Sequence, residues 1–119
     1  MEFQRGDVVL IAFPYIQDFS RSKDRPAVII QNDIGNAYGD NLMLASITSQ
    51  VPEQEYPVHY RVYAGSQIAK EAGLDKDCVV KAETIVTIPK TRVLEKLGRF
   101  PPEAMAEINR CLRVSLDLE

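Results

Sequence analysis

The sequence predicts a mostly β protein, in which a small, curled and largely antiparallel barrel is followed by a C-terminal helix. Short runs of β-branched and aromatic residues, separated by turn-forming residues, follow one another over most of the chain. The spacing of apolar residues changes to that of a helix only after Pro101. The 119 residues are close to the most common domain size, so we expect 1–119 to form a single domain.

The first half of the barrel is predicted from two apolar runs. Residues 6–13 begin with a turn residue and continue as a buried strand. A long polar loop is predicted over 14–24, and a second buried strand over 25–31. Pro26 is tolerable in that strand only at its first position or at a sheet edge. Residues 32–41 are dense in Asn, Asp and Gly, which indicates a turn or an irregular connection.

The second half begins with a third strand, predicted over 42–48. Residues 58–64 alternate between polar and apolar side chains, which favours a half-exposed strand. Residues 65–77 then predict a loop with a turn at Gly73.

The last part of the chain predicts a long strand and then a helix. Residues 78–88 are strand-like, with a bend expected between positions 81 and 84. Residues 90–100 are ambiguous and favour a short helical turn followed by a strand that ends at Gly98. From Pro101 onward, apolar residues recur at helical spacing, which predicts an amphipathic C-terminal helix. These positions are Met105, Ile108, Leu112 and Leu116.

Composition and charge exclude several classes of protein. Hydrophobic residues make up 45% and charged residues 26% of the chain, as in ordinary globular domains. No apolar run approaches the ~18 to 20 residues of a membrane helix, and the N-terminus lacks the layout of a signal peptide. We therefore expect a soluble, cytoplasmic protein. The formal net charge of −3 argues against coating nucleic acid through bulk charge but leaves room for a local basic site.

Residue types that often carry catalysis are sparse. His59 is the only histidine, and Cys78 and Cys111 lie far apart without the paired spacing of a zinc site. A lone histidine within a strand is more often structural than catalytic, and the two cysteines are typical of reduced, apolar core residues. We expect neither a metal nor a cofactor.

A basic segment lies directly before the second predicted strand. Arg21, Lys23 and Arg25 follow Ser20 and alternate with polar residues, so several donors fall within a few positions. A guanidinium binds phosphate in a bidentate way and stays charged at any working pH. The plainer alternative is a solvated loop in which the arginine pairs with Asp24 or another acid.

A second small cluster, Thr48 and Ser49, lies at the end of the third predicted strand. Their hydroxyl groups can hydrogen-bond a phosphate oxygen, although strand ends commonly carry such residues. Both clusters flank strands of one small barrel, so they can lie close together.

Taken in order, the motifs resemble the MazF/PemK toxin family over essentially the whole chain. They are RGDVVLIAFPY, RPAVIIQNDIGN, ITSQ, YPVHYRV, AGLDKDCVV, TIPKTRV and LGRF, followed by the closing helix. The resemblance implies an SH3-like β-barrel of the MazF/PemK/CcdB type. It also implies a sequence-specific, metal-independent endoribonuclease of a type II toxin–antitoxin system, which cleaves single-stranded RNA as a homodimer and is blocked by a cognate antitoxin.

The resemblance also suggests roles for individual residues. By position, Arg25 corresponds to the family's catalytic arginine and Thr48 to its catalytic threonine. Ser20, Arg21, Lys23 and Ser49 resemble RNA-contacting positions. Two departures stand out: DFSRSK replaces a Gly-rich loop, and ETIVT places Thr84 and Val86 where other members carry a glutamine and an arginine.

RNA supplies its own nucleophile, the 2′-hydroxyl, so cleavage needs no metal-bound water. Arg25 suits the stabilisation of charge on the transition state better than proton transfer, because a guanidinium stays charged at any working pH. Two other readings stay open from the sequence. One is a barrel that acts by binding a protein target, as the gyrase-poisoning toxins do, and the other is a non-catalytic RNA-binding module.

Overall fold

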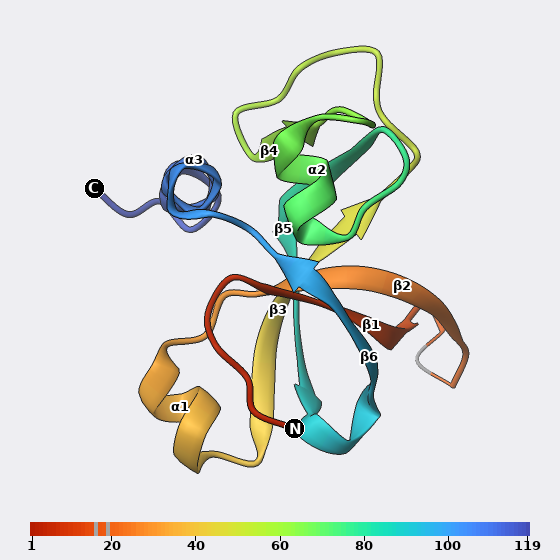
Figure 1. Ribbon diagram of the computed structural model, residues 1–119, viewed down its shortest axis with the longest axis vertical. Coiled ribbons are helices and arrows are strands. Elements are labelled where there is room, and N and C mark those ends of the chain that lie inside the picture. Colours follow the sequence, from red (N-terminus) through yellow and green to blue (C-terminus); the bar gives the residue numbers. More distant parts are fainter. Residues whose placement is uncertain (16, 19) are drawn as a thin grey trace.

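The computed structural model describes residues 1–15, 17–18 and 20–119; positions 16 and 19 of the predicted loop lie outside the described residues. Figure 1 shows the arrangement. The elements are β1 (Asp7–Pro14), β2 (Ser22–Ile29), α1 (Asp33–Tyr38), β3 (Asn41–Thr48), β4 (His59–Val62), α2 (Gln67–Ala72), β5 (Cys78–Pro89), the 3₁₀ turn η1 (Lys90–Arg92), β6 (Val93–Arg99) and α3 (Pro102–Ser115).

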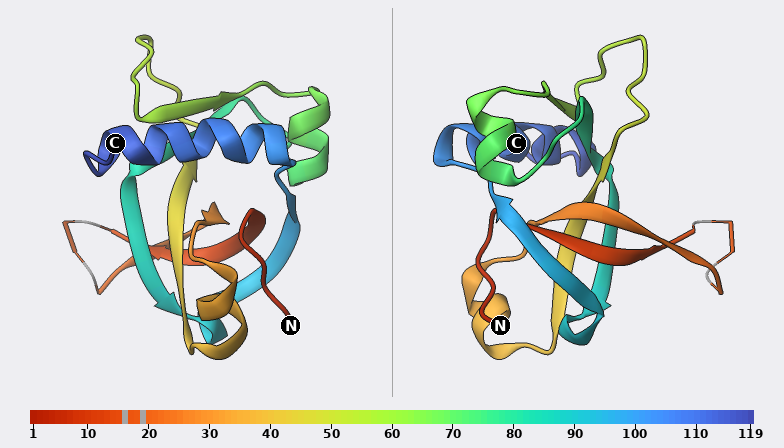
Figure 2. Two further views of the ribbon diagram at one scale, coloured as in Figure 1. Left: turned by 90° about the vertical axis from the view of Figure 1, so that its left-hand side faces the viewer. Right: turned by 45° about the vertical axis from the view of Figure 1, so that its right-hand side comes forward.

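The strands form one curled sheet in the order β4-β5-β3-β2-β1-β6, and every pairing in it is antiparallel. The predicted class, a mostly β barrel-like fold with a C-terminal helix, is confirmed. The two outer strands, β4 and β6, do not pair with each other within the described residues, so the sheet is not closed. Helices α2 and α3 lie across this opening (Figures 1 and 2). No helix in the described part of the chain is long and apolar enough to cross a membrane.

Two glycines allow α2 to approach β6 closely. Gly73 ends α2 in the left-handed conformation, with φ of 72°, and a Cβ atom there would collide with the carbonyl oxygen of Leu97. A Cβ atom at Gly98 would likewise collide with the backbone at the end of α2. Only glycine fits at such an approach, so this pair brings one edge of the sheet against the helix.

Each face of the sheet carries its own apolar cluster, because successive residues of a strand point to opposite faces. One cluster lies beneath α3 and includes Val28, Ala45 and Val80. The other fills the hollow of the curled sheet and includes Ile29 and Leu44.

The C-terminal helix is amphipathic, as predicted. Met105, Ile108 and Leu112 are buried against the sheet. Leu116 is the exception: its side chain is 53% exposed, because the helix ends at Ser115 and the residue lies beyond the packed face.

Two short helices replace segments that the sequence predicted to be irregular. Residues 33–38 form α1, whose N-terminus is capped by the Asn32 side chain accepting the Gly35 N–H at 2.9 Å. Residues 67–72 form α2, which is capped in the same way by Ser66. Both N-cap residues are typical helix-start signals, and the density of Asn, Asp and Gly around the first one obscured it.

The second strand begins three residues earlier than predicted, at Ser22 instead of Arg25. Its first residues pair with the end of β1, with Pro14 opposite Ser22 and Ile11 opposite Arg25. The β1–β2 hairpin therefore extends beyond the barrel. Pro26 lies inside β2, yet β3 pairs with β2 only from Ala27 onward, so the missing N–H falls on an open edge.

The predicted bend in the long strand is confirmed. In the pairing of β3 with β5, Ser46 lies opposite Lys81 while Ala45 lies opposite Ile85. The intervening residues of β5 form a bulge. A bulge bends its strand and redirects side chains. Before the bulge, β5 pairs with both β4 and the end of β3, and after it β5 pairs with β3 alone. The predicted strand over 58–64 is shorter in the structure, where β4 spans His59–Val62.

Candidate active site

The candidate site lies where the inner face of the sheet changes from apolar to polar. Along β2, Ile29 and Ala27 are buried in the inner cluster. The next residue on the same face is Arg25, since side chains two apart in a strand share a face. The Arg25 side chain therefore lies at the edge of the apolar interior, where it is only half-buried.

The neighbouring strand β3 changes in the same way. Leu44 belongs to the inner cluster, and Ser46 and Thr48 follow on the same face. Ser46 lies opposite Ala27 of β2 and is 4% exposed. The hydroxyl groups of β3 thus lie beside the arginine of β2, as the sequence analysis expected of the two clusters.

Arg25 and Thr48 together line two adjoining cavities of about 290 and 180 Å³. The larger cavity also contains two carboxylates, Asp24 and Asp75. The smaller one contains Lys81 as a second cation and, among its described lining residues, no carboxylate. A surface cavity with two cations and several hydroxyls favours an anion, and a phosphate group in particular.

The Arg25 side chain has no ion pair or hydrogen bond to any described residue. The plainer interpretation, in which the arginine pairs with Asp24 or another acid, is wrong for the described part of the chain. A half-buried guanidinium without a counter-ion is unfavourable in the free protein and is available to a ligand's negative charge.

Thr48 is the last residue of β3, and its side chain closes a small turn with the backbone that follows. Its Oγ1 accepts the backbone N–H of Gln50 at 3.1 Å. That bond uses the oxygen as acceptor and leaves the hydroxyl hydrogen free to donate. Thr48 is half-buried and is therefore held in place beside Arg25 with a donor available.

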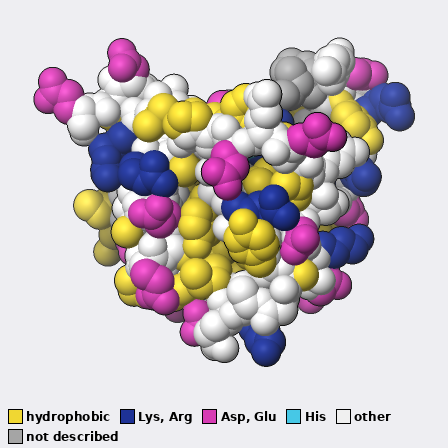
Figure 3. Space-filling model, turned by 90° about the horizontal axis from the view of Figure 1, so that it is seen from above, with side chains coloured by type: hydrophobic (Ala, Val, Ile, Leu, Met, Phe, Trp, Pro, Cys, Tyr) yellow, Lys and Arg dark blue, Asp and Glu magenta, His cyan; other side chains and the backbone are white. Residues whose placement is uncertain are grey.

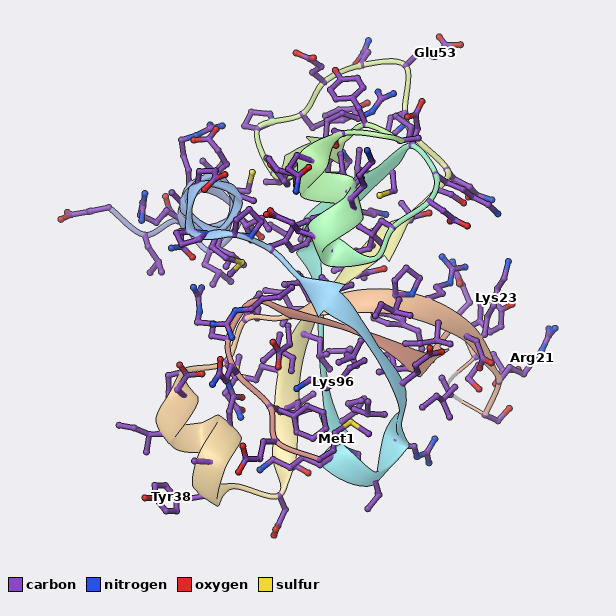
Figure 4. The ribbon with its side chains drawn as sticks, in the orientation of Figure 1. Met1, Arg21, Lys23, Tyr38, Glu53 and Lys96 are labelled. Atoms are coloured by element: carbon purple, nitrogen blue, oxygen red, sulfur yellow. The ribbon has the colours of Figure 1, made fainter. Side chains whose placement is uncertain are left out.

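The remaining predicted RNA-contacting residues divide into two groups. Lys23 and Ser49 are exposed and line the larger cavity with Arg25. Ser20 and Arg21 lie farther out on the hairpin and do not line either cavity. Figure 4 shows Arg21 and Lys23 extending outward from the hairpin.

Among the described residues of the hairpin, Ser20 and Arg21 have contacts within the hairpin itself. The Ser20 hydroxyl donates to Asp18 Oδ1 at 2.6 Å, and its backbone N–H donates to the same atom at 3.1 Å. These bonds hold the pKa of the Asp18 carboxyl below its usual value. The Arg21 guanidinium lies 5.3 Å from the centre of the Tyr15 ring, a cation–π contact that orients it.

Sequence reasoning missed Ser46, Gln50 and Lys81 as members of the site, although all three line the smaller cavity with Arg25 and Thr48. Lys81 carried a weak signal, because it is the first polar residue after the apolar start of its strand, although Glu83 and Thr84 follow closely. Thr84, one of the departures from the family pattern, lines the same cavity. The β5 bulge places Lys81 and Thr84 there together, and a bulge of this size cannot be derived from alternation alone.

The cysteines and the histidine contribute little to this site. Cys78 lines the larger cavity, but burial raises the pKa of its thiol to about 11, so it is a poor nucleophile at neutral pH. His59 lies outside both cavities, and its Nε2 is 2.8 Å from Glu83 Oε2. No group of three potential metal ligands occurs among the described residues.

Seen from above, hydrophobic side chains gather in the middle of the surface, with acidic and basic residues interspersed around them (Figure 3). There is no uniformly basic field on this face, which agrees with the net charge of −3. Among the described residues, the positive charge lining the smaller cavity of the candidate site comes from Arg25 and Lys81.

The sequence matches a model of the PemK-like, MazF-like toxins of type II toxin–antitoxin systems over residues 4–116. The chain belongs to this family. The resemblance found in the sequence motifs is thereby confirmed. Among curated proteins, an endoribonuclease MazF from Staphylococcus saprophyticus is 36% identical over 115 residues, which cover 97% of this chain and 92% of the relative.

Solved structures of such toxins share the fold at lower identity. A mycobacterial endoribonuclease, solved in complex with its cognate antitoxin, has a TM-score of 0.76 at 23% identity and covers 98% of this chain and 97% of its own. MazF from Deinococcus radiodurans has a TM-score of 0.74 at 20% identity, with 99% of each chain covered. The toxin MazF-mt6 of Mycobacterium tuberculosis has a TM-score of 0.71 at 19% identity, covering 93% of this chain and 98% of its own.

Proposed function

We propose that this toxin is a metal-independent endoribonuclease that cleaves single-stranded RNA in the Arg25–Thr48 site. The observation that carries the proposal is the smaller cavity, which joins Arg25, Lys81 and the Thr48 hydroxyl without a described carboxylate. The 36% identity to an endoribonuclease over nearly the whole chain supports it.

The reaction uses the RNA's own 2′-hydroxyl. Its oxygen attacks the adjacent phosphorus and loses its proton, the bond from phosphorus to the 5′-oxygen breaks, and that oxygen gains a proton. The products are a 2′,3′-cyclic phosphate and a 5′-hydroxyl. Charge accumulates on the non-bridging oxygens as the attack proceeds, so fixed positive groups and donors at those oxygens lower the barrier.

Arg25 supplies the main electrostatic contribution. Its guanidinium is half-buried and unpaired within the described structure, and a partly desolvated cation interacts more strongly with developing charge than one in water. A guanidinium keeps its proton at any working pH, which makes it a poor proton carrier. Lys81 adds a second positive charge in the same cavity.

Thr48 acts as a hydrogen-bond donor at the reacting phosphate. Its Oγ1 already accepts from the Gln50 backbone, so the hydroxyl hydrogen is directed away from that bond. It can donate to a non-bridging oxygen or orient the 2′-hydroxyl. Lys23 and Ser49 bind the RNA backbone beside the cleaved position, while Arg21 and Ser20 contact more distant nucleotides from the hairpin.

We further propose that residues 1–119 act as one domain in the cytoplasm, as a homodimer and under control of a cognate antitoxin. A symmetric pair of barrels would grip a longer RNA segment than one shallow site can. A disordered, acidic antitoxin segment would complement the unpaired cations at Arg25 and Lys81. Light scattering should give about twice the chain mass of 13.4 kDa, and the antitoxin should block cleavage.

The decisive experiment is cleavage of a long, mixed-sequence RNA by the purified protein in excess EDTA. We expect cleavage at defined positions, with 2′,3′-cyclic phosphate and 5′-hydroxyl ends, and no cleavage where the cut nucleotide carries a 2′-deoxy sugar. The Arg25→Ala variant, prepared in parallel, controls for contaminating nucleases. Loss of activity on chelation or 5′-phosphate products would refute the mechanism. Binding of RNA without any product would favour a binding module instead.

A further inference from the structure

A third cavity, of about 630 Å³, lies between the loop over 51–57, β4 and α3. It adjoins the candidate site, because the loop leaves β3 directly after Gln50, which itself lines both of the smaller cavities. In both views of Figure 2, this loop rises from the upper end of the molecule, and the β1–β2 hairpin extends sideways below it. Its volume falls within the range of small-molecule sites.

The register of the sheet places this cavity on the same face as Arg25 and Thr48. Val79 of β5 lies opposite Thr48 on one side and opposite Arg61 on the other. Residues directly opposite in an antiparallel pair share a face. Arg61 is therefore two strands from Thr48, roughly 10 Å across the sheet, a separation that a dinucleotide spans.

One wall of the cavity is aromatic. The ring of Tyr56 contacts that of His59 with centroids 5.2 Å apart and an interplanar angle of 69°. The His59 ring is fixed by Glu83, and the Tyr56 carbonyl accepts the His59 backbone N–H at 2.9 Å. Tyr56 is still 44% exposed. Flat, held in place and accessible, it resembles the aromatic platforms on which unpaired bases stack.

Arg61 forms a second, polar wall. Its guanidinium lies 4.7 Å from the centre of the Tyr63 ring and 3.6 Å from the Asp77 carboxylate, which limits its freedom before any ligand arrives. Its Nε is the buried side-chain donor that, within the described part of the chain, has no hydrogen-bond partner.

The remaining charges of the cavity are balanced. Arg110 lines it from α3 and is paired with Glu107 at 2.9 Å. Glu53 and Glu55 line it from the loop, and Figure 4 shows Glu53 at the outer end of that loop. Mixed charge suits an uncharged heterocycle better than a phosphate. Carboxylates accept from the exocyclic amino groups of bases, and arginine donates to their carbonyl and ring-nitrogen acceptors.

From this arrangement we propose that the cavity binds one unpaired nucleobase of the RNA, next to the cleaved phosphate. The inference rests on the proposed endoribonuclease function and adds a site that selects the base at one flanking position. The base stacks on Tyr56, while Arg61 and the loop carboxylates read its edge. The backbone on the other side of that nucleotide leads to Arg25 and Thr48.

The first test compares cut-site preferences. Wild type, Tyr56→Ala and a matched control, Tyr38→Ala, are given the same mixed-sequence RNA, and the cut ends are sequenced. Tyr38 is 87% exposed on α1 and lies at the opposite end of the molecule from Glu53 (Figure 4). We expect Tyr56→Ala to lose base preference at one flanking position only, while Tyr38→Ala keeps the wild-type pattern.

The second test measures binding with RNA that cannot be cut. A short RNA of the preferred sequence carries a 2′-deoxy sugar at the cut position and an abasic nucleotide at each flanking position in turn. For wild type, one abasic position should weaken binding about tenfold, the scale of losing a stacked base. In Tyr56→Ala the same change should have less than about a twofold effect, and Tyr56→Phe should behave as wild type.

The outcomes separate the two proposals. If wild type cuts no RNA, the proposed function fails and the flanking site with it. If wild type cuts, but Tyr56→Ala keeps both its preference and its sensitivity to every abasic position, the nucleobase site alone is refuted. If Tyr56→Ala instead changes the oligomeric state with an unaltered preference, the cavity is a contact between copies of the chain, which also refutes the nucleobase site.

Discussion

Two clusters of charged side chains in this molecule differ in whether their charges are compensated. Asp7, at the start of β1, is 4% exposed. Its Oδ2 accepts the Gln4 N–H at 2.8 Å, and Lys96 Nζ and Arg99 Nη1 lie 3.3 and 3.8 Å from its oxygens. Arg25 and Lys81, in contrast, share a cavity in which no described carboxylate faces them.

The comparison separates a structural charge from a functional one. A buried carboxylate with three partners fixes the N-terminal segment against β6 and contributes to folding. Two cations that form no ion pair repel each other, and although Asp24 and Asp75 line the adjoining cavity, neither cation stabilises the free protein as a salt bridge would. Sites that break the usual pairing rule in this way are commonly where a ligand binds. Substitutions in the two clusters should therefore change different measurements.

The largest effect is expected for Arg25→Ala. We expect the cleavage rate to fall by at least ~10²-fold, because the main stabilising group for transition-state charge is lost. Arg25→Lys should recover only part of the rate, since the bidentate geometry is lost. Initial rates on a defined RNA and thermal unfolding by circular dichroism measure activity and stability separately.

Arg113→Ala, an exposed change in the last turn of α3, is the matched control and should stay within about twofold of wild type. Thermal stability of Arg25→Ala should be unchanged or slightly higher, because an uncompensated charge has been removed. A well-folded Arg25→Ala protein that cuts at the wild-type rate would show that the site is misassigned.

Asp7→Asn should affect stability instead of catalysis. We expect a loss of about 1–2 kcal/mol in the free energy of unfolding, reduced from the value for a fully buried pair because Lys96 and Arg99 are partly exposed. Urea unfolding measures it. Glu107→Gln removes a carboxylate from an exposed pair on α3 and should cost less than about 0.5 kcal/mol. If Asp7→Asn instead reduces the cleavage rate per folded molecule, the distinction between the clusters fails.

The sequence was most informative where one periodicity runs unbroken. Apolar runs located the strands, and the change of spacing after Pro101 located α3. The short helices escaped prediction because six residues provide barely two turns of pattern, and their Asn32 and Ser66 caps resemble ordinary turn residues. The early start of β2 was missed because its first residues are polar and pair only with β1.

The same reasoning explains what the sequence revealed of the site. Arg25 was identified because it belongs to a basic segment at the start of a strand, and Thr48 because its hydroxyl lies at the end of one; the family resemblance then assigned them roles. Lys81 was not identified as a site residue, because its place in the cavity depends on the β5 bulge, which shifts the register between β3 and β5. Whether Arg25 had a counter-ion also depended on tertiary contacts, which no local pattern encodes.

Thr48→Ala is expected to lower the cleavage rate about tenfold, less than Arg25→Ala, because one neutral donor is lost. Thr48→Ser should keep most of the activity, since the hydroxyl remains. Thr87→Ala, an exposed threonine on the other half of β5, is the control and should cut normally. Equal rates for Thr48→Ala and wild type under single-turnover conditions would remove the threonine from the reaction.

The smallest effect is expected at the rim, for Lys23→Ala. Lys23 is exposed on the hairpin and lines the larger cavity, where Asp24 and Asp75 partly offset its charge. The substitution should weaken RNA binding a few-fold without changing the maximal rate, because Lys23 contacts a phosphate away from the cleaved bond. The slope of log affinity against log salt should become shallower by about 0.7, the contribution of one contact to single-stranded RNA. Fluorescence anisotropy with uncleavable RNA at several salt concentrations measures the affinity and its salt dependence.

The control for this prediction is Lys70→Ala, which removes an exposed lysine from α2, outside all three cavities, and should leave the slope unchanged. A reduced maximal rate with an unchanged slope would place Lys23 with Arg25 at the reacting phosphate instead of at the rim.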